Sequence, residues 1–225
     1  MTLAERLSGI HSGMAAAAVK SGRSASAVRL CAVSKTFPAS AVEEVAAAGQ
    51  LLFGENRVQE CMDKIPHCPA GLSWHLIGHL QSNKVRKILP LVACVQSVDS
   101  VALARDISRI AGDMGVQAHI MLQVNISGDD AKHGLAAEAT MPALDQIRQM
   151  PNIMIDGLMT IPRLDLSPEA ARPHFAALRT LAEKLRAAGG IALPELSMGM
   201  SADYAVAIEE GATLVRVGSA LFGGR

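Results

Sequence analysis

Short apolar segments alternate with longer amphipathic segments along most of the chain. The short segments predict strands over residues 30–34, 51–54, 73–78, 92–98, 118–124, 154–159, 195–198 and 213–217. The amphipathic segments predict helices over residues 1–20, 38–49, 57–65, 83–89, 100–114, 137–149, 168–188 and 202–210. Strands that alternate with helices favour right-handed βαβ units and a parallel sheet.

Eight predicted strands indicate a closed (β/α)8 barrel of the TIM type, and an open doubly wound sheet is the alternative. The 225 residues are slightly fewer than the roughly 250 typical of that barrel. The sequence ends soon after the eighth strand, so the last covering helix is missing unless the N-terminal helix takes its place. Since nothing in the sequence resembles a linker or a repeat, we expect one domain over residues 1–225.

Composition narrows the classes of partner and the cellular location. The chain has 21 basic and 21 acidic residues, and this zero net charge argues against nucleic-acid binding. Apolar runs stay well short of the ~20 residues of a membrane span, and residues 1–20 do not have the form of a signal peptide. The four cysteines form no CxxC pair, so we expect free thiols in a cytoplasmic protein.

Polar and glycine residues follow most of the predicted strands. Such clusters lie at residues 34–36, 54–56, 78–84, 125–127, 159–160, 198–201 and 216–219. Because the carboxyl ends of parallel strands share one face of a barrel, we expect these clusters to form a single ligand site.

Lys35 directly follows the first predicted strand and is therefore expected at the mouth of the barrel. A lysine that is desolvated there loses its proton more easily and attacks a carbonyl to form a Schiff base. The alternative explanation is an ordinary solvated lysine at a strand end.

Glycines and serines after the last two strands predict an anion site. Gly199 and Ser201 precede a helix, and Gly218 and Ser219 follow the last strand. Free backbone N–H groups and a hydroxyl bind phosphate well, and barrels often bind phosphate at this position. Turn glycines and a helix cap at Ser201 explain the same residues without a ligand.

Arg216 is a charged residue inside an apolar strand and needs a partner. Strand alternation places it on the same face as Leu214, pointing into the barrel toward a ligand or a carboxylate. Glu55 and Asp156 are the acidic partners that we consider.

Other polar residues suggest weaker possibilities. His75 and His79 share a strand face but lack a third ligand in the sequence, so we expect no metal site. Residues 129–134 predict a loop over the barrel mouth from which Lys132 reaches an anion. The chain has neither a Ser-His-Asp order nor a GxGxxG nucleotide motif.

Several motifs in order resemble the YggS/PROSC family of pyridoxal phosphate homeostasis proteins. They cover nearly the whole chain: Ala32-Val-Ser-Lys35, Phe53-Gly-Glu-Asn-Arg-Val-Gln-Glu60, Trp74-His-Leu-Ile-Gly78, Leu80-Gln-Ser-Asn-Lys84, Gly157-Leu-Met-Thr-Ile-Pro162, Leu196-Ser-Met-Gly-Met-Ser201 and Val215-Arg-Val-Gly218. Two positions differ from the usual family pattern. Ala212 stands where the family often has serine, and Ser219 stands where it often has threonine, which keeps a hydroxyl.

The resemblance implies a fold-type III barrel, related to the N-terminal domain of alanine racemase, that binds pyridoxal 5'-phosphate. Lys35 would carry this cofactor as a Schiff base, and Arg216 would face its pyridine nitrogen. The resemblance assigns the phosphate to Ser201, Gly218 and Ser219, and the surroundings of the ring to Asn56, His79 and Met159.

The resemblance and the residues together predict binding without catalysis, so we assign no catalytic residue. An arginine at the pyridine nitrogen keeps its own proton and donates a hydrogen bond, so that nitrogen stays unprotonated. An unprotonated ring is a weaker electron acceptor. Racemases of this fold add a tyrosine base from a partner's extra β domain, whereas this sequence stops after the barrel and its single tyrosine is Tyr204.

We therefore expect a monomer that buffers pyridoxal phosphate and delivers it to apo-enzymes that depend on it. An amino-acid racemase or lyase on the same barrel is the alternative. Composition and patterning alone also allow a cofactor-independent barrel enzyme that acts on a sugar phosphate.

Overall fold

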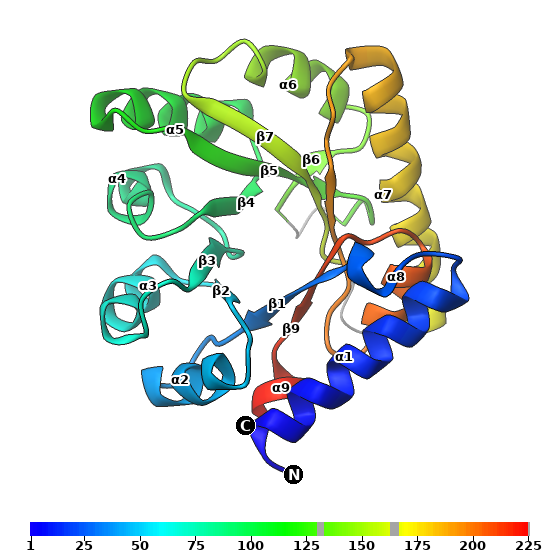
Figure 1. Cartoon of the computed structure of the whole chain (residues 1–225). Coiled ribbons are helices and arrows are strands. Elements are labelled where there is room, and N and C mark those ends of the chain that lie inside the picture. The colour runs from blue at the N-terminus through cyan, green and yellow to red at the C-terminus, as the bar shows by residue number, and fades with distance from the viewer. Residues whose placement is uncertain (130–132, 163–166, 225) are drawn as a thin grey trace.

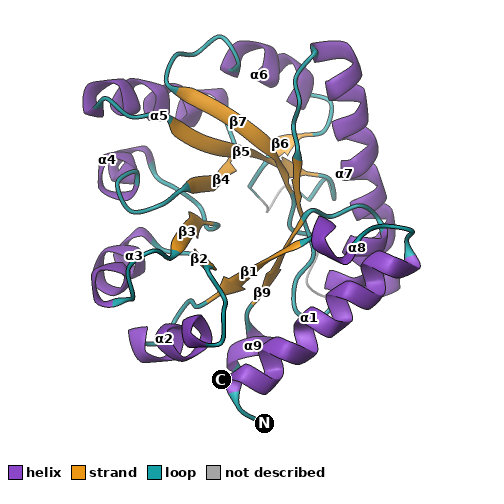
Figure 2. Cartoon of the chain, viewed as in Figure 1, coloured by secondary structure: helices purple, strands orange, loops and turns teal. Residues whose placement is uncertain are grey.

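A computed structural model describes residues 1–129, 133–162 and 167–224, and over these residues eight parallel strands close into a barrel (Figures 1 and 2). The neighbour order is β4-β3-β2-β1-β9-β8-β7-β5, and the pairing of β4 with β5 closes the ring. The strands are β1 Arg29–Val33, β2 Leu52–Glu55, β3 Ser73–Leu76, β4 Cys94–Val98, β5 Ala118–Asn125, β7 Ile153–Met159, β8 Glu195–Ser197 and β9 Leu214–Val217. The predicted barrel is confirmed, and the open sheet is wrong.

Helices surround the barrel (Figure 2). They are α1 Leu3–Lys20, α2 Ala39–Ala47, α3 Val58–Lys64, α4 Val85–Ile88, α5 Val101–Met114, α6 Thr140–Ile147, α7 Pro168–Gly189, α8 Tyr204–Glu209 and α9 Ser219–Phe222. Short 3-10 turns occupy Ala25–Ala27, Ile65–His67 and Ser82–Lys84.

Local signals in the sequence fix several helix ends. Thr2 and Glu5 form a reciprocal capping box at the start of α1, which satisfies two backbone N–H groups. Ser100 caps α5, and Gly115 ends that helix in the left-handed conformation that glycine adopts without a steric penalty.

The N-terminal helix takes the place of the last covering helix. α1 packs against α8, α9 and α2, which closes the helical ring beside β1 and β9 (Figure 1). Its apolar side contributes Leu7, Ile10 and Met14 to the core. The structure thereby resolves the alternative that the sequence left open.

Two short elements escaped the sequence analysis. β6, Leu135–Ala136, adds a two-residue parallel pairing to the end of β5, and α9 is a single turn after β9. Neither is long enough to show a hydrophobic period, so the pattern of apolar residues gives no signal for them.

The apolar core has two parts. The larger part lies between strands and helices, and Val215 and Val217 face it as predicted. The smaller part lies inside the barrel and consists of Cys31, Leu52, Cys94, Met121, Met159 and Leu214. Burial raises the pKa of Cys31 to about 12, so this thiol stays protonated and packs as a small apolar side chain.

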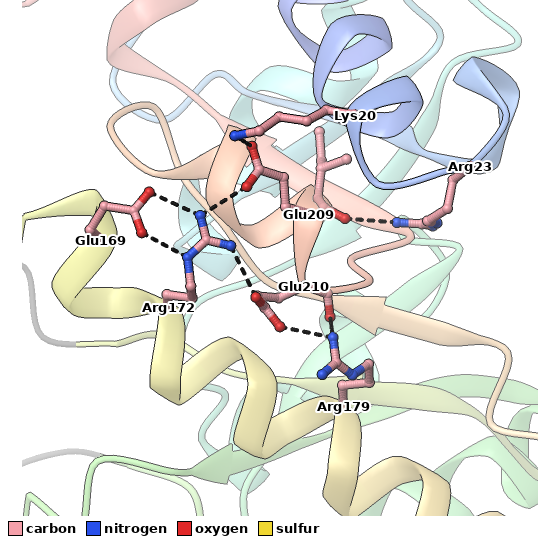
Figure 3. A network of polar contacts seen from close by, with 8 residues as sticks. Lys20, Arg23, Glu169, Arg172, Arg179, Glu209 and Glu210 are labelled. Carbon is pink, nitrogen blue, oxygen red and sulfur yellow. Dashed lines mark hydrogen bonds and ion pairs between the residues drawn. The ribbon is translucent and has the colours of Figure 1, made fainter.

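Ion pairs join α7, α8 and α1 on the outside of the barrel (Figure 3). Arg172 of α7 contacts Glu169 of its own helix and both Glu209 and Glu210 at the end of α8. Lys20 of α1 contacts the same Glu209 at 2.7 Å. This network connects the two ends of the sequence to the long helix between them.

Within the described part of the chain, none of the helices has both the length and the apolar character needed to cross a membrane.

Candidate functional site

A pocket of about 510 Å³ opens at the carboxyl ends of the strands. Six of the eight residues predicted for the site line it, namely Lys35, Asn56, Ser201, Arg216, Gly218 and Ser219. The remaining lining residues, which the sequence analysis did not single out, are Val33, Ile77, Ile161, Met200, Ala202 and Asp203. This volume falls in the range of small-molecule sites.

Lys35 extends from the end of β1 and is exposed, so the expected desolvation of its amine is absent from this structure. The next residue, Thr36, has a φ of 68°, which is unusual for a β-branched side chain. Its backbone N–H donates to Glu60 Oε2 at 2.8 Å, which helps to hold this conformation. Backbone strain of this kind concentrates at functional sites.

A buried polar cluster fixes the end of β1 just before Lys35. Ser34 Oγ donates to Glu55 Oε1 at 2.7 Å, and Lys64 Nζ donates to the same oxygen and to the Ser34 carbonyl. Burial raises the pKa of Glu55, although Lys64 and Ser34 act in the opposite direction. The sequence analysis missed Lys64, because a lysine in the last turn of a helix normally lies in solvent.

Two backbone N–H groups converge on the hydroxyl of Ser201. Gly218 N and Ala220 N both donate to Ser201 Oγ at 3.2 Å. Gly218 lies between β9 and α9 and Ala220 lies in the first turn of α9, whereas Ser201 follows β8. The predicted anion-site residues therefore lie together, with the two N–H groups donating to the Ser201 hydroxyl.

Two glycines allow the close approach of the loops around the pocket. Gly199 has a φ of 93°, and a Cβ there would lie 2.5 Å from Ala207 Cβ. A Cβ at Gly78 would lie 2.1 Å from the backbone oxygen of Asn56. Any larger residue at either position would displace the loop that carries Ser201 or Asn56.

Arg216 heads a chain of hydrogen bonds across the barrel interior. Its guanidinium donates to Ser197 Oγ at 2.6 Å and to the Thr160 carbonyl at 2.8 Å. Ser197 Oγ donates to Gln96 Oε1 at 2.6 Å, and Gln96 Nε2 lies 2.7 Å from His75 Nδ1. Four strands thus contribute to the position of one guanidinium beneath the pocket.

The prediction that Arg216 points into the barrel is confirmed, but neither acidic partner contacts it. Glu55 is paired with Lys64, and Asp156 lies 2.9 Å from His119. Arg216 is 3% exposed, and burial lowers its pKa to about 10. It stays protonated at neutral pH and binds neutral oxygens.

His75 forms the far end of this series of hydrogen bonds. Burial lowers the pKa of His75 to about 4, with smaller contributions from Arg29 and His119. The neutral ring accepts a hydrogen bond from Gln96 at Nδ1. The sequence analysis missed Gln96 and Ser197, because single polar residues inside short apolar strands give no indication of what they bind.

Asp203 is a further pocket residue that the sequence did not reveal. It is buried, and its Oδ1 accepts a hydrogen bond from Met200 N at 2.6 Å. Burial raises its pKa, and Met200 and Arg216 oppose this shift. The only available signal was its position just before a helix, where an aspartate normally serves as a cap.

Two predicted residues lie apart from the pocket lining. Met159 is fully buried in the inner core, against which Ile161 packs. His79 stacks on His133, with ring centroids 4.1 Å apart, and lies beside Asp99. Lys132, the predicted anion ligand of the loop, is outside the described residues.

The sequence matches a family model described as "Alanine racemase, N-terminal domain" over residues 15–225. It is also 39% identical to a pyridoxal phosphate homeostasis protein of Aquifex aeolicus, over all of this chain and 99% of that protein.

Two solved structures place the fold in context. PipY of Synechococcus elongatus, solved with PLP bound, has a TM-score of 0.86 and 42% identity and is matched over 99% of this chain and 100% of its own. An alanine racemase of Clostridium difficile has a TM-score of 0.70 at 17% identity, over 88% of this chain and 53% of that enzyme. The racemase likeness shows the barrel fold alone.

Proposed function

The chain belongs to the pyridoxal phosphate homeostasis protein family, and we propose that it binds pyridoxal 5'-phosphate reversibly in the pocket at Lys35. The observation that carries this proposal is that an exposed amine, a buried guanidinium, the Ser201 hydroxyl and the turn at Gly218 and Ser219 line one pocket. These groups match the aldehyde, the pyridine nitrogen and the phosphate of PLP, the ligand named for PipY.

The donors in the pocket fit the parts of this ligand. When bound, pyridoxal phosphate supplies an aldehyde that condenses with an amine. Lys35 Nζ provides that amine at the end of β1, in the mouth of the barrel. Ser201, Gly218 and Ser219 would hold the phosphate, and Arg216 would donate to the pyridine nitrogen. Asn56 Oδ1 is buried without a hydrogen-bond partner among the described residues, and we assign Asn56 to the ring.

The same residues support binding without turnover. The Arg216 guanidinium offers only hydrogen-bond donors, so the ring nitrogen that it contacts would stay unprotonated and the ring would accept electrons poorly. The hydroxyl of Tyr204, the single tyrosine, lies against α1, where a Cβ on Gly13 would approach it to 2.5 Å. The tyrosine therefore faces the helical layer and not the pocket. This arrangement favours a carrier of the cofactor over the alternative, a racemase or lyase.

We propose that this carrier is a single domain over residues 1–225 that acts as a cytoplasmic monomer. It would hold a reactive aldehyde and release it to apo-enzymes that require pyridoxal phosphate. The four free cysteines are consistent with a reducing compartment.

Absorbance spectroscopy tests the covalent link. Purified protein with added pyridoxal phosphate should gain a band near the visible edge, and Lys35→Ala should lose it. Lys87→Ala, an exposed lysine on α4, should keep the band as the matched control. Borohydride should fix the label on the peptide that contains Lys35. A band that persists in Lys35→Ala would show that the lysine assignment is wrong.

A turnover assay separates the carrier from the enzyme. The loaded protein is incubated with enantiopure amino acids, and optical rotation and released products are followed. We expect no sustained change above free pyridoxal phosphate. Catalytic turnover that Lys35→Ala abolishes would establish the racemase or lyase instead.

A further inference from the structure

Two histidines and an aspartate meet at the barrel mouth, outside the lining of the proposed pyridoxal phosphate pocket. His79 follows β3, Asp99 follows β4, and His133 lies between β5 and β6. One ligand atom from each of these residues lies within 4.8 Å of the other two, which makes this the one such group found among the described residues. The sequence analysis found no third ligand beside His75 and His79, whereas the fold brings Asp99 and His133 to His79.

The spacing of these atoms suits a shared metal ion better than hydrogen bonds. Asp99 Oδ2 lies 3.3 Å from His79 Nδ1 and 3.7 Å from His133 Nδ1. Charge-assisted N–H···O bonds are shorter, at about 2.7–2.9 Å. Ligand bonds of about 2.0–2.1 Å in a tetrahedral site place neighbouring ligand atoms about 3.3 Å apart.

The two rings are free enough to complete such a site. His79 and His133 have side chains 44% and 61% exposed, while Asp99 is only 14% exposed. The rings are stacked 15° from parallel, so each must tilt out of the stack to direct its lone pair at a common ion. Exposed side chains make such rotations at little cost, and the more buried carboxylate provides the fixed point.

We propose that His79, Asp99 and His133 bind one divalent transition-metal ion of the zinc class. Two imidazoles and one carboxylate form a ligand set that this class binds, with further positions left for water. The bound ion would tie the segment at His133 to the ends of β3 and β4. This proposal does not depend on the pyridoxal phosphate site.

A second histidine–aspartate pair offers a matched control. His119 Nδ1 lies 2.9 Å from Asp156 Oδ1, and its side chain is 46% exposed, much like that of His79. A short two-residue pair of this kind is a hydrogen bond or ion pair, and a third ligand atom is not grouped with it among the described residues. Its loss should therefore leave metal binding unchanged.

Titration with metal alone tests the proposal. The full chain is titrated with Zn²⁺ by calorimetry and with Co²⁺ by visible absorbance. We expect one ion per chain and cobalt bands typical of nitrogen and oxygen ligands. His79→Ala, His133→Ala and Asp99→Asn should each weaken binding by at least about tenfold, which is the loss seen even for outer partners of metal ligands. His119→Ala should bind like the parent protein.

Several results would overturn the proposal. The parent protein could fail to bind metal at 1:1 and higher metal ratios. His79→Ala could bind metal as tightly as the parent protein, or His119→Ala could lose as much affinity as His79→Ala. Metal held by pyridoxal phosphate itself would persist in His79→Ala and count against the site. Thermal unfolding of each variant without metal checks the fold, and the exposed positions of both histidines predict no change there.

Discussion

Arg216 and Arg172 are both held by several hydrogen bonds, but in opposite surroundings. Arg216 lies inside the barrel, is 3% exposed and donates to the neutral oxygens of Ser197 and Thr160. Arg172 lies on the outer helices with a side chain 30% exposed and contacts three glutamates (Figure 3). Burial lowers the pKa of Arg216, whereas hydrogen bonds to Glu169, Glu209 and Glu210 raise the pKa of Arg172.

These different surroundings indicate different roles for the two arginines. A buried cation that contacts no carboxylate costs stability, since neutral oxygens replace only part of its hydration. The Arg172 network has complementary charges and links α7 to α8 and α1. We attribute the buried position of Arg216 to its proposed role at the pyridine nitrogen, and the exposed contacts of Arg172 to the arrangement of the helices.

Acidification should have the largest effect on the free energy of unfolding, through His75 at the far end of the hydrogen bonds that begin at Arg216. Unfolded histidine binds a proton below pH 6.5, but burial lowers the pKa of folded His75 to about 4. The unfolded state therefore takes up more protons between these values, and stability falls as the pH falls. We expect a loss of about 3 kcal/mol between pH 7 and pH 4, measured by urea unfolding.

Two variants isolate this effect. His75→Gln should remove most of the loss between pH 6.5 and 4, because the titrating group is gone. His11→Gln, an exposed histidine on α1, should keep it. An unchanged pH profile in His75→Gln would mean that another group causes the loss.

Gln96→Leu should have the next largest effect. Gln96 is fully buried and bridges His75 and Ser197, so its replacement leaves buried polar atoms without partners. We expect a loss of about 2 kcal/mol in the free energy of unfolding at pH 7. Gln117→Leu, at an exposed position just before β5, should change it by less than about 0.5 kcal/mol. Equal effects of the two variants would contradict a cooperative chain beneath Arg216.

Arg172→Gln should have the smallest effect and the strongest dependence on salt. Its ion pairs are partly exposed, so at low ionic strength we expect Tm to fall by about 2 °C. The difference should shrink in 1 M NaCl, where the screening length is about 3 Å. Arg105→Gln, an exposed arginine of α5, is the matched control. A salt-independent loss would show that Arg172 acts through packing.

The sequence predicted those parts of the site that depend on position along a strand. Lys35, Ser201 and Gly218 follow strands, and the parallel barrel brings such ends to one face. The alternation of side chains within β9 was enough to predict that Arg216 points into the barrel. It was not enough to identify its partners, because Ser197 lies in β8 and Thr160 follows β7, and the sequence does not show the register of these strands.

The sequence did not predict the ring contacts or the buried ion pair, for the same reason. Lys64 and Glu55 are nine residues apart, yet α3 must first pack on β2 before they meet. His79 stacks on His133, 54 positions later in the chain, a contact that the sequence did not predict. Contacts of this kind depend on side-chain distances that only the packed barrel defines.

The amino-acid sequence by itself determined the alternation of strands and helices, the inward side of β9 and the residues at the strand ends, because periodicity and turn chemistry are local. Only the tertiary structure decided that α1 completes the helical ring and that Gln96 and Ser197 form hydrogen bonds in series with Arg216. It also decided that Asp99 lies beside two histidines at the barrel mouth. These arrangements depend on closure of the barrel, which brings distant strands within the few ångströms over which hydrogen bonds and ligands act.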